Sequence, residues 1–259
     1  MVKNIFSLEG KKALVIGGGG GIGQAIATGL SEAGAEVAIA SRNKEKLEKV
    51  AAQIGEKTGS AVRVYECDVT DEAQVEKLAA DFIGDNGCID ILVNSQGYNK
   101  KYPVCEHPMD EWDQMYNVNI RSIMLSCKYF GRHMIDRKYG RIINVCSIGA
   151  ERNKPMDDSA AYSSTKGAVA TLTMVLATGW GKHGITVNAI APIMTETDMM
   201  KSIFEKMPEL RDGTAARVPV GRICLPEDAI PPAVFFASDA TEFVNGQTIY
   251  LDGAMRWLQ

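Results

Sequence analysis

Residues 12–33 read KALVIGGGGGIGQAIATGLSEA, in which an apolar run leads through six glycines in seven residues into a stretch of helical spacing. The apolar residues 12–16 predict a short buried strand, and residues 24–33 predict a helix. The glycines therefore occupy a strand-to-helix turn. Bare backbone and the free N–H groups of a helix N-terminus can hold a pyrophosphate there, so the stretch indicates a dinucleotide-binding protein.

The glycine run is compatible with two registers. Gly18, Gly20 and Gly23 fit the spacing G-x-G-x-x-G, and Gly17, Gly21 and Gly23 fit G-x-x-x-G-x-G. The residues themselves leave both registers open.

Outward from this turn, short apolar and β-branched runs alternate with stretches of helical spacing. Further strands are predicted at residues 36–40, 61–67, 89–93, 141–145, 185–190 and 247–251, and further helices at residues 43–55, 71–84, 109–138 and 163–182. Continuous apolar strands are typical of a parallel sheet that helices cover on both faces. We therefore expect residues 1–259 to form one doubly wound α/β Rossmann domain with a seven-stranded parallel sheet. Residues 195–222, rich in Met and charge, have no strand pattern and are expected to form a flap near a site.

Composition narrows the class of protein. The 259 residues carry a net charge of −4 with both signs interspersed, which argues against a nucleic-acid partner. The six cysteines form no C-x-x-C pair and the three histidines lie apart from them, so we expect reduced thiols and no metal site. No apolar run is long enough for a membrane span, and the N-terminus lacks a signal-peptide core. The expected location is the cytoplasm, without a membrane partner.

Polar residues follow the predicted strands at the edge where open α/β sheets bind their ligands. They are Asp68 with Val69, Asn94 to Gly97, Ser147, and Pro192 with Thr195 and Thr197. Tyr162 and Lys166 come next, four residues apart and thus on one helix face. A free phenol has a pKa of about 10, and a neighbouring ammonium stabilises its phenolate. Tyr162 could then exchange a proton while Ser147 holds the substrate oxygen.

Taken in order, these motifs resemble the short-chain dehydrogenase/reductase family over residues 10–253. The resemblance selects the register Gly17, Gly21 and Gly23 and leaves residues 18–20 as open loop. It implies a tetrad of Asn119, Ser147, Tyr162 and Lys166, in which Asn119 holds a water in a proton relay and Lys166 also holds the nicotinamide ribose. The resemblance also implies that further residues bind the cofactor. Asp68 and Val69 would lie beside the adenine, and Pro192, Thr195 and Thr197 beside the nicotinamide. The remaining ones are Gly17, Gly21, Ile22, Gly23, Asn94 and Gly97.

The chain departs from the family pattern around the cofactor. Ile16 replaces the usual Thr, Ser95 and Gln96 replace Asn and Ala, and Ile193 replaces Gly. A charged loop at residues 150–159 lengthens the spacing from the serine to the tyrosine. None of these departures touches the tetrad.

The residues after the second predicted strand bear on the choice of nicotinamide. Ser41 and Arg42 offer a hydroxyl and a guanidinium suited to a 2′-phosphate, which favours NADP(H). Gly20 stands where a second basic residue would strengthen that choice, so phosphate recognition rests largely on Arg42. An Arg42 that is only solvated or stacked on adenine would leave NAD(H) as the cofactor.

Four basic residues are expected near the nicotinamide and would attract an anionic substrate: Lys100, Lys101, Arg152 and Lys154. Asn94 to Trp112 and Arg141 to Ser147 are similar to the gluconate 5-dehydrogenase branch of the family. This resemblance implies an NAD(P)-dependent oxidoreductase that interconverts a secondary alcohol and a ketone on a sugar acid or polyol.

Two alternatives and an assembly state complete the expectations. The Met-rich flap (Met194, Met199, Met200 and Met207) would suit a hydrophobic ketone, of steroid or 3-oxoacyl type. A catalytically silent nucleotide-binding sensor or scaffold would keep the fold without the chemistry. The long helices at residues 109–138 and 163–182, together with the family resemblance, imply a homotetramer or homodimer.

Overall fold

The computed structural model describes residues 4–151 and 157–257 and contains one parallel sheet of seven strands. The strands are β1 Lys12–Ile16, β2 Glu36–Ser41, β3 Arg63–Glu66, β4 Ile91–Asn94, β5 Gly140–Val145, β6 Ile185–Pro192 and β7 Thr248–Leu251. Their spatial order is β3-β2-β1-β4-β5-β6-β7. The order reverses between β1 and β4, which makes their carboxyl ends the expected site of a ligand. The predicted doubly wound fold with a seven-stranded parallel sheet is confirmed.

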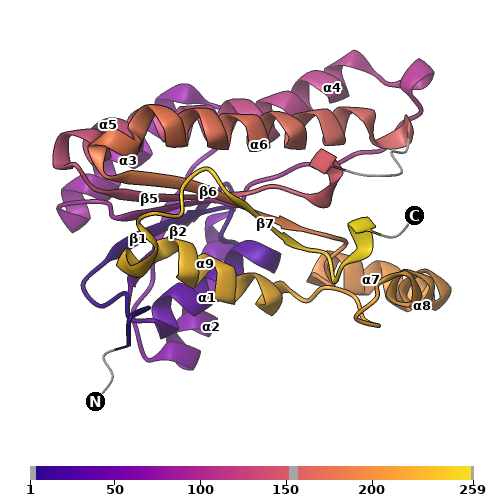
Figure 1. Cartoon of the computed structure of the whole chain (residues 1–259), viewed down its shortest axis with the longest axis horizontal. Helices are drawn as coiled ribbons and strands as arrows, with labels where there is room; N and C mark the ends of the chain where they lie inside the picture. Colours follow the sequence, from indigo (N-terminus) through magenta and orange to yellow (C-terminus); the bar gives the residue numbers. More distant parts are fainter. Residues whose placement is uncertain (1–3, 152–156, 258–259) are drawn as a thin grey trace.

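Helices cover both faces of this sheet. They are α1 Gly21–Glu32, α2 Lys44–Thr58, α3 Glu72–Asn86, α4 Met109–Tyr116, α5 Ser122–Arg137, α6 Ala160–Trp180, α7 Asp198–Lys206, α8 Pro208–Arg217 and α9 Ile230–Ala237. Helices α3, α5 and α6 lie on one face, and α1, α2 and α9 lie on the other (Figure 1). Short 3₁₀ helices occupy Val104–Glu106, Ile148–Glu151, Asp157–Ser159, Gly181–His183, Pro226–Ala229, Asp239–Thr241 and Met255–Trp257.

The alternation of buried side chains along β1 explains the two layers. Leu14 and Ile16 pack into the core under α3, α5 and α6, whereas Ala13 and Val15 pack into the core over α1, α2 and α9. All four are fully buried. A strand apolar on both faces is stable only between two helical layers, so its sequence accounts for the position of β1 at the centre of the sheet.

Side-chain caps fix the starts of two helices. Asn43 accepts a hydrogen bond from the backbone N of Lys46 at the start of α2, as expected for the predicted cap. Asp71 accepts from the backbone N of Ala73 and of Gln74 at the start of α3. Both helices therefore begin where their capping residues place them.

Two predicted segments differ from the structure. Residues 109–138 are not one regular helix, because a π-helical turn, Asn117–Arg121, separates α4 from α5. Residues 195–222 lack a strand, as expected, but contain the helix pair α7 and α8, which lies below and to one side of the sheet (Figure 1). The backbone N of Glu196 donates to the carbonyl of Cys224 at 2.8 Å, so the two ends of this segment are joined.

Candidate active site

The glycine turn brings three segments of the chain together. A methyl group added to Gly17, whose φ is +80°, would lie 2.6 Å from the backbone N of Gln96. A methyl group on Gly23 would lie 2.3 Å from the carbonyl oxygen of Gly17. Gly21 has a φ of +53°, and a methyl group there would lie 3.0 Å from Cγ2 of Thr197. Side chains are thus excluded at Gly17, Gly21 and Gly23, which favours that register of the cofactor motif.

The middle of the glycine run is more crowded than expected. A methyl group on Gly18 would lie 2.6 Å from Cγ2 of Ile39. Gly18 is therefore packed against β2, and the expectation of an open loop over residues 18–20 is wrong at its first position. The close approach of turn and strand is the physical reason.

Two polar side chains border the outer side of the glycine turn, and Arg42 directly follows β2 beside one of them, Ser41. A methyl group on Gly19 would lie 3.1 Å from Oγ of Ser41, and one on Gly20 would lie 3.2 Å from Nζ of Lys46. Arg42 is exposed and, within residues 4–151 and 157–257, has no ion-pair partner. Lys46 is absent from the sequence-based candidates. It stands in the first turn of α2, where side chains point back toward the helix N-terminus and so reach the glycines.

Ser147 and Tyr162 face the same small space beside Gly149. A methyl group on Gly149 would lie 3.5 Å from Oγ of Ser147 and 3.7 Å from Cδ1 of Tyr162. Ser147 follows β5, and its Oγ accepts a hydrogen bond from the backbone N of Gly149 at 3.1 Å. Tyr162 lies in the first turn of α6. The strand end and the helix start thus place a hydroxyl and a phenol side by side.

Lys166 lies one turn further along α6 and is only 3% exposed. Its Nζ lies 5.7 Å from the centre of the Tyr162 ring and donates to the carbonyl of Val145 at 2.9 Å. A methyl group on Gly97 would lie 3.9 Å from this Nζ and 3.8 Å from Oδ1 of Asn119. Asn119 and Lys166 therefore approach each other near Gly97, while Ser147 and Tyr162 meet beside Gly149.

The side chain of Asn119 is already engaged by the protein. Its Oδ1 accepts from the backbone N of Tyr98 at 2.7 Å, and its Nδ2 donates to the carbonyl of Tyr98 at 2.8 Å and to Oγ1 of Thr165 at 3.1 Å. The residue is fully buried in the π-helical turn. Its amide thus braces the loop after β4 against α6, and binding of a water would fall to its backbone.

A buried polar network supports the strand ends beneath these residues. Asn94 donates to Oδ1 of Asn144 at 2.9 Å and accepts from Oγ of Ser126 at 2.6 Å. Asn144 in turn donates to Oγ1 of Thr173 at 3.0 Å. The bonds tie β4 and β5 to α5 and α6. The sequence motif identifies Asn94 alone, because the partners are joined only through the folded sheet.

The other residues expected to bind the cofactor lie at the same edge of the sheet. Oδ1 of Asp68 accepts from the backbone N and the hydroxyl of Thr70, and Val69 is buried. Thr195 donates its hydroxyl to the carbonyl of Ile193, and Thr197 borders the glycine turn. Predicted residues from the ends of β1, β3, β4 and β6 are therefore gathered along one edge.

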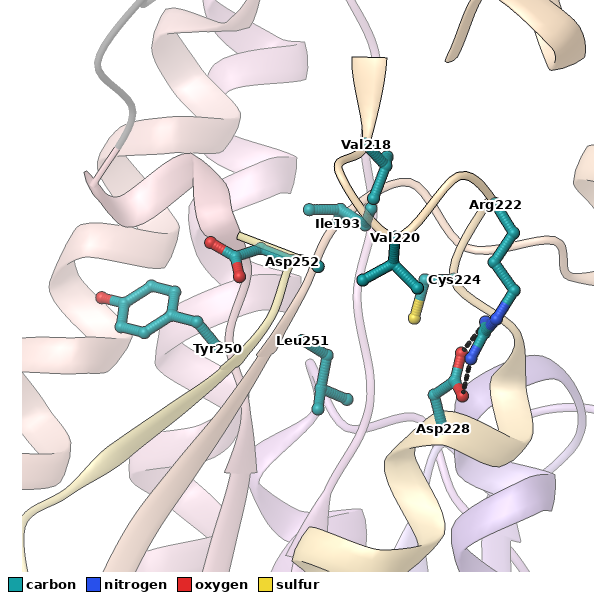
Figure 2. Close-up of a pocket in the computed structure, with 10 residues that line it drawn as sticks. Ile193, Val218, Val220, Arg222, Cys224, Asp228, Tyr250, Leu251 and Asp252 are labelled. Atoms are coloured by element: carbon teal, nitrogen blue, oxygen red, sulfur yellow. Dashed lines mark hydrogen bonds and ion pairs between the residues drawn. The ribbon is translucent and has the colours of Figure 1, made fainter. Parts of the chain in front are cut away.

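A cavity of about 270 Å³ lies between the end of β7 and the base of the 195–222 segment. Figure 2 shows Ile193, Val218 and Cys224 close together in this cavity, with the paired Arg222 and Asp228 at its side. Burial raises the pKa of the Cys224 thiol to about 11, so the thiol stays protonated at neutral pH. Ile193, which stands where the family usually has Gly, thus contributes an apolar wall next to Pro192.

Lys100 and Lys101, the lysines expected to attract an anion, each form an ion pair with a carboxylate of the same chain. Lys100 forms an ion pair with Glu111, which also accepts from the Tyr98 hydroxyl, and Lys101 forms one with Asp158 at 3.2 Å. The hydrogen bonds from Lys100 and Tyr98 hold the pKa of Glu111 below its usual value. The charges of these two lysines are therefore largely neutralised. Arg152 and Lys154, the other expected cations, lie outside the described residues.

A membrane-spanning helix and a metal site each have requirements against which the described residues can be compared. No helix among them is both long and apolar enough to span a bilayer. Within the same residues, no group of three His, Cys, Asp or Glu side chains is placed to hold a metal ion.

Comparison with known proteins places this edge of the sheet in a family context. A family model described as enoyl-(acyl carrier protein) reductase matches residues 17–256. Gluconate 5-dehydrogenase from Gluconobacter oxydans is 38% identical in sequence, and the match covers 97% of each chain. D-threitol dehydrogenase from Mycolicibacterium smegmatis is 36% identical, and the match covers 96% of this chain and 94% of that protein. The crystal structure of a gluconate 5-dehydrogenase from Burkholderia cenocepacia in complex with NADP and tartrate is 36% identical over 99% of each chain, with a TM-score of 0.91.

The match to the family model spans most of the chain, and both relatives are covered almost from end to end. The order of motifs that suggested the family is thus accompanied by full-length similarity in sequence and in structure. The chain belongs to the short-chain dehydrogenase/reductase family, whose members use a nicotinamide cofactor, and is an oxidoreductase that acts on CH–OH groups.

Proposed function

We propose that the protein uses NADP(H) to interconvert a secondary alcohol and a ketone on a sugar acid, as a gluconate 5-dehydrogenase does. The observation that carries the proposal is the approach of Ser147, Tyr162 and Lys166 to one another at the switch point of the sheet. Its substrate class is supported by the full-length similarity to gluconate 5-dehydrogenases.

The three side chains take separate parts in the proposed reaction. Because Oγ of Ser147 accepts from Gly149, its own proton is left to donate to the substrate oxygen. Tyr162 gives or takes the proton on that oxygen, and the buried ammonium of Lys166 holds positive charge beside the phenol. When bound, the nicotinamide supplies or accepts a hydride. Asn119 keeps the loop after β4 in place and offers its backbone to a relay water.

The cofactor would be held along the edge of the sheet. The glycine turn suits a pyrophosphate because side chains are excluded there. Ser41, Arg42 and Lys46 would hold a 2′-phosphate. The adenine is assigned to Asp68 and Val69, and the nicotinamide end to Asn94, Gly97, Pro192, Thr195 and Thr197.

Replacement of Tyr162 tests the mechanism. Tyr162→Phe removes the hydroxyl that exchanges the proton, so we expect turnover to fall at least about a hundredfold while NADPH still binds. Turnover is followed by absorbance of the reduced cofactor with aldonic acids, ketoaldonic acids, polyols and hydroxysteroids. Unchanged turnover of every accepted substrate would contradict the role proposed for Tyr162, whereas a wild-type protein that binds NADPH but turns over none of these substrates would favour a nucleotide-binding sensor.

The charge of the substrate is tested separately. Because Lys100 and Lys101 are paired, recognition of a carboxylate is assigned to Arg152 and Lys154. Replacing both with Ala should raise KM about tenfold for a sugar acid and leave KM for a neutral polyol unchanged. Lys138→Ala, at the far end of α5, is the control. Equal effects on acid and polyol would instead support a neutral substrate such as the one in the name of the D-threitol relative.

A hydrophobic ketone is a second candidate because the flap exposes apolar side chains. Met194 and Met207 are 40% and 46% exposed, and Ile193 and Val218 line a cavity at the base of the 195–222 segment. Methionine adapts its shape to apolar ligands. Turnover of a hydroxysteroid above that of every sugar acid would favour this candidate.

The organisation of the molecule is proposed on separate grounds. We assign residues 1–259 to one Rossmann domain, with residues 195–222 as its substrate flap. None of the six cysteines, all of which lie in the described residues, forms a disulfide, which is typical of a reducing compartment and supports a cytoplasmic location. Met124, Met174 and Val175 expose apolar surface on α5 and α6, which supports a homodimer or homotetramer.

A further inference from the structure

Gln96 is a buried amide at a position where the family usually has alanine. It follows β4 and is only 7% exposed. Its Nε2 donates to Oγ of Ser122 at 3.0 Å. Its Oε1 is buried and has no hydrogen-bond donor within reach in the part of the chain that the structure describes. The hydrogen bond to Ser122 therefore fixes the orientation of this amide.

Ser122 completes the π-helical turn that precedes α5. Its backbone N donates to the carbonyl of Asn117, five residues earlier, as in a π-helix. Its hydroxyl donates to the carbonyl of Val118 at 2.5 Å. In an α-helix the backbone N of Ser122 would bond to that carbonyl. The side chain of Ser122 thus supplies the hydrogen bond that the backbone of the turn gives up.

The shape of this turn sets the position of Asn119. Asn119 lies in the middle of the turn and is fully buried. Its amide is held by Tyr98 and Thr165, so its side chain is anchored independently of Ser122. The direction of its backbone, however, depends on which hydrogen bonds the turn makes.

We infer that Gln96 is a positioning residue for Asn119, because through Ser122 it holds the shape of the π-helical turn and with it the direction of the Asn119 backbone. The backbone N of Gln96 also packs against Gly17, so one residue touches both the cofactor turn and the catalytic turn. The inference rests on the proposed function, in which the Asn119 backbone binds a relay water.

The test is removal of the amide with its length retained. In Gln96→Met we expect kcat to fall about tenfold, KM for NADPH to stay within about twofold, and the midpoint of the kcat–pH profile to move. The profile moves because the relay that returns protons to Tyr162 is displaced. Ser122→Ala should produce the same changes. Since both variants break one hydrogen-bonded unit, the double variant should be no worse than either alone.

The control is Gln53→Met, which removes a surface amide that bonds to Gln24 and should leave kcat and the pH profile unchanged. Circular dichroism and Tm establish that each variant is folded. A folded Gln96→Met or Ser122→Ala enzyme with wild-type kcat and pH profile would overturn the inference, as would additive losses in the double variant. If Gln96→Met does not fold, Ser122→Ala, which removes a single oxygen, decides the question.

Tyr162→Phe separates failure of the inference from failure of the proposed function. Lost turnover in Tyr162→Phe with an unmoved pH profile in Gln96→Met overturns the inference alone. Retained turnover in Tyr162→Phe overturns the proposed function and this inference with it.

Discussion

Lys46, which borders the glycine turn, and the exposed Arg42, which follows β2, have no ion-pair partner among the described residues. A cation left without a protein partner next to a nucleotide site is available for a phosphate. The sequence motif draws attention to Arg42 because it directly follows β2. Lys46 reaches the same place from the first turn of α2, so two charges rather than one can meet a 2′-phosphate.

Replacement of these cations should change cofactor choice. Lys46→Ala and Arg42→Ala should each raise KM for NADPH about tenfold, because each removes a charge-assisted hydrogen bond, and should leave KM for NADH nearly unchanged. Steady-state kinetics with both cofactors measures this. Lys49→Ala, on an exposed part of α2, is the control. Equal increases for both cofactors would mean that Lys46 supports the turn rather than the phosphate.

The sequence predicts the residues proposed to react better than the residues that support them. Ser147, Tyr162 and Lys166 belong to a motif with fixed spacing, and the structure places them together. Lys46 belongs to no such motif, and Gln96 departs from the motif in which it stands. Their contacts arise from tertiary packing between segments far apart in the chain, which periodicity and spacing do not encode.

Among the elements, the 195–222 segment is joined to the sheet at a narrow base. Arg222 donates to both carboxylate oxygens of Asp228, at 2.6 and 2.7 Å. These hydrogen bonds hold the pKa of Asp228 below its ordinary value. The carboxylate therefore stabilises the fold fully above an unfolded pKa of about 4, and this contribution is lost as pH falls through the lower folded pKa.

This ion pair predicts a pH-dependent difference in stability. Asp228→Asn should lower the free energy of unfolding by about 1 kcal/mol at pH 7, a modest value because the Arg222 side chain is half exposed. Below pH 4 the difference from the wild type should shrink. Urea unfolding at both pH values measures it, with the exposed Asp113→Asn as control. A difference that stays constant down to pH 3 would contradict the assignment.

The sequence predicts the bounds of some elements and misses those of others. Strand β1 has the predicted bounds, because a short apolar run ending in glycine allows little else. The helix predicted over residues 109–138 is interrupted because the Ser122 hydroxyl and the Gln96 amide stabilise a π-helical turn. Hydrophobic periodicity barely registers one inserted residue. Helix α9 also escapes prediction, since its prolines at positions 231 and 232 resemble a break rather than a helix start.

At the scale of the whole molecule, the exposed apolar side chains on α5 and α6 predict assembly. Light scattering should give a multiple of the 28.1 kDa chain mass, corresponding to a dimer or tetramer. Val175→Asp places a charge on a side chain that is 61% exposed in the isolated chain, and should dissociate the assembly while leaving the fold intact. Phe243→Ser, on a different exposed loop, is the comparison. A wild-type monomer would refute the proposal.

The doubly wound architecture was within reach of the sequence for a general reason. Parallel strands between two helical layers need continuous apolar runs, and the alternation of such runs with amphipathic stretches admits few other topologies. The strand order at the C-terminal edge, the 195–222 helices and the cavity beneath them depend on side-chain packing, and the sequence alone does not determine them.

The narrow attachment of residues 195–222 has an evolutionary consequence. The segment is joined to the domain by the hydrogen bond from Glu196 to Cys224 and by the packing of Val218 against Ile148 and Ile193, and Thr197 borders the glycine turn. The exposed side chains of α7 and α8 lie outside these contacts, so substitutions there can accumulate without moving the ends of the strands. Relatives named for gluconate and for D-threitol share this chain's length. Divergence confined to such a segment is a physical route by which one ancestral catalyst gives rise to a lineage of enzymes with different substrates.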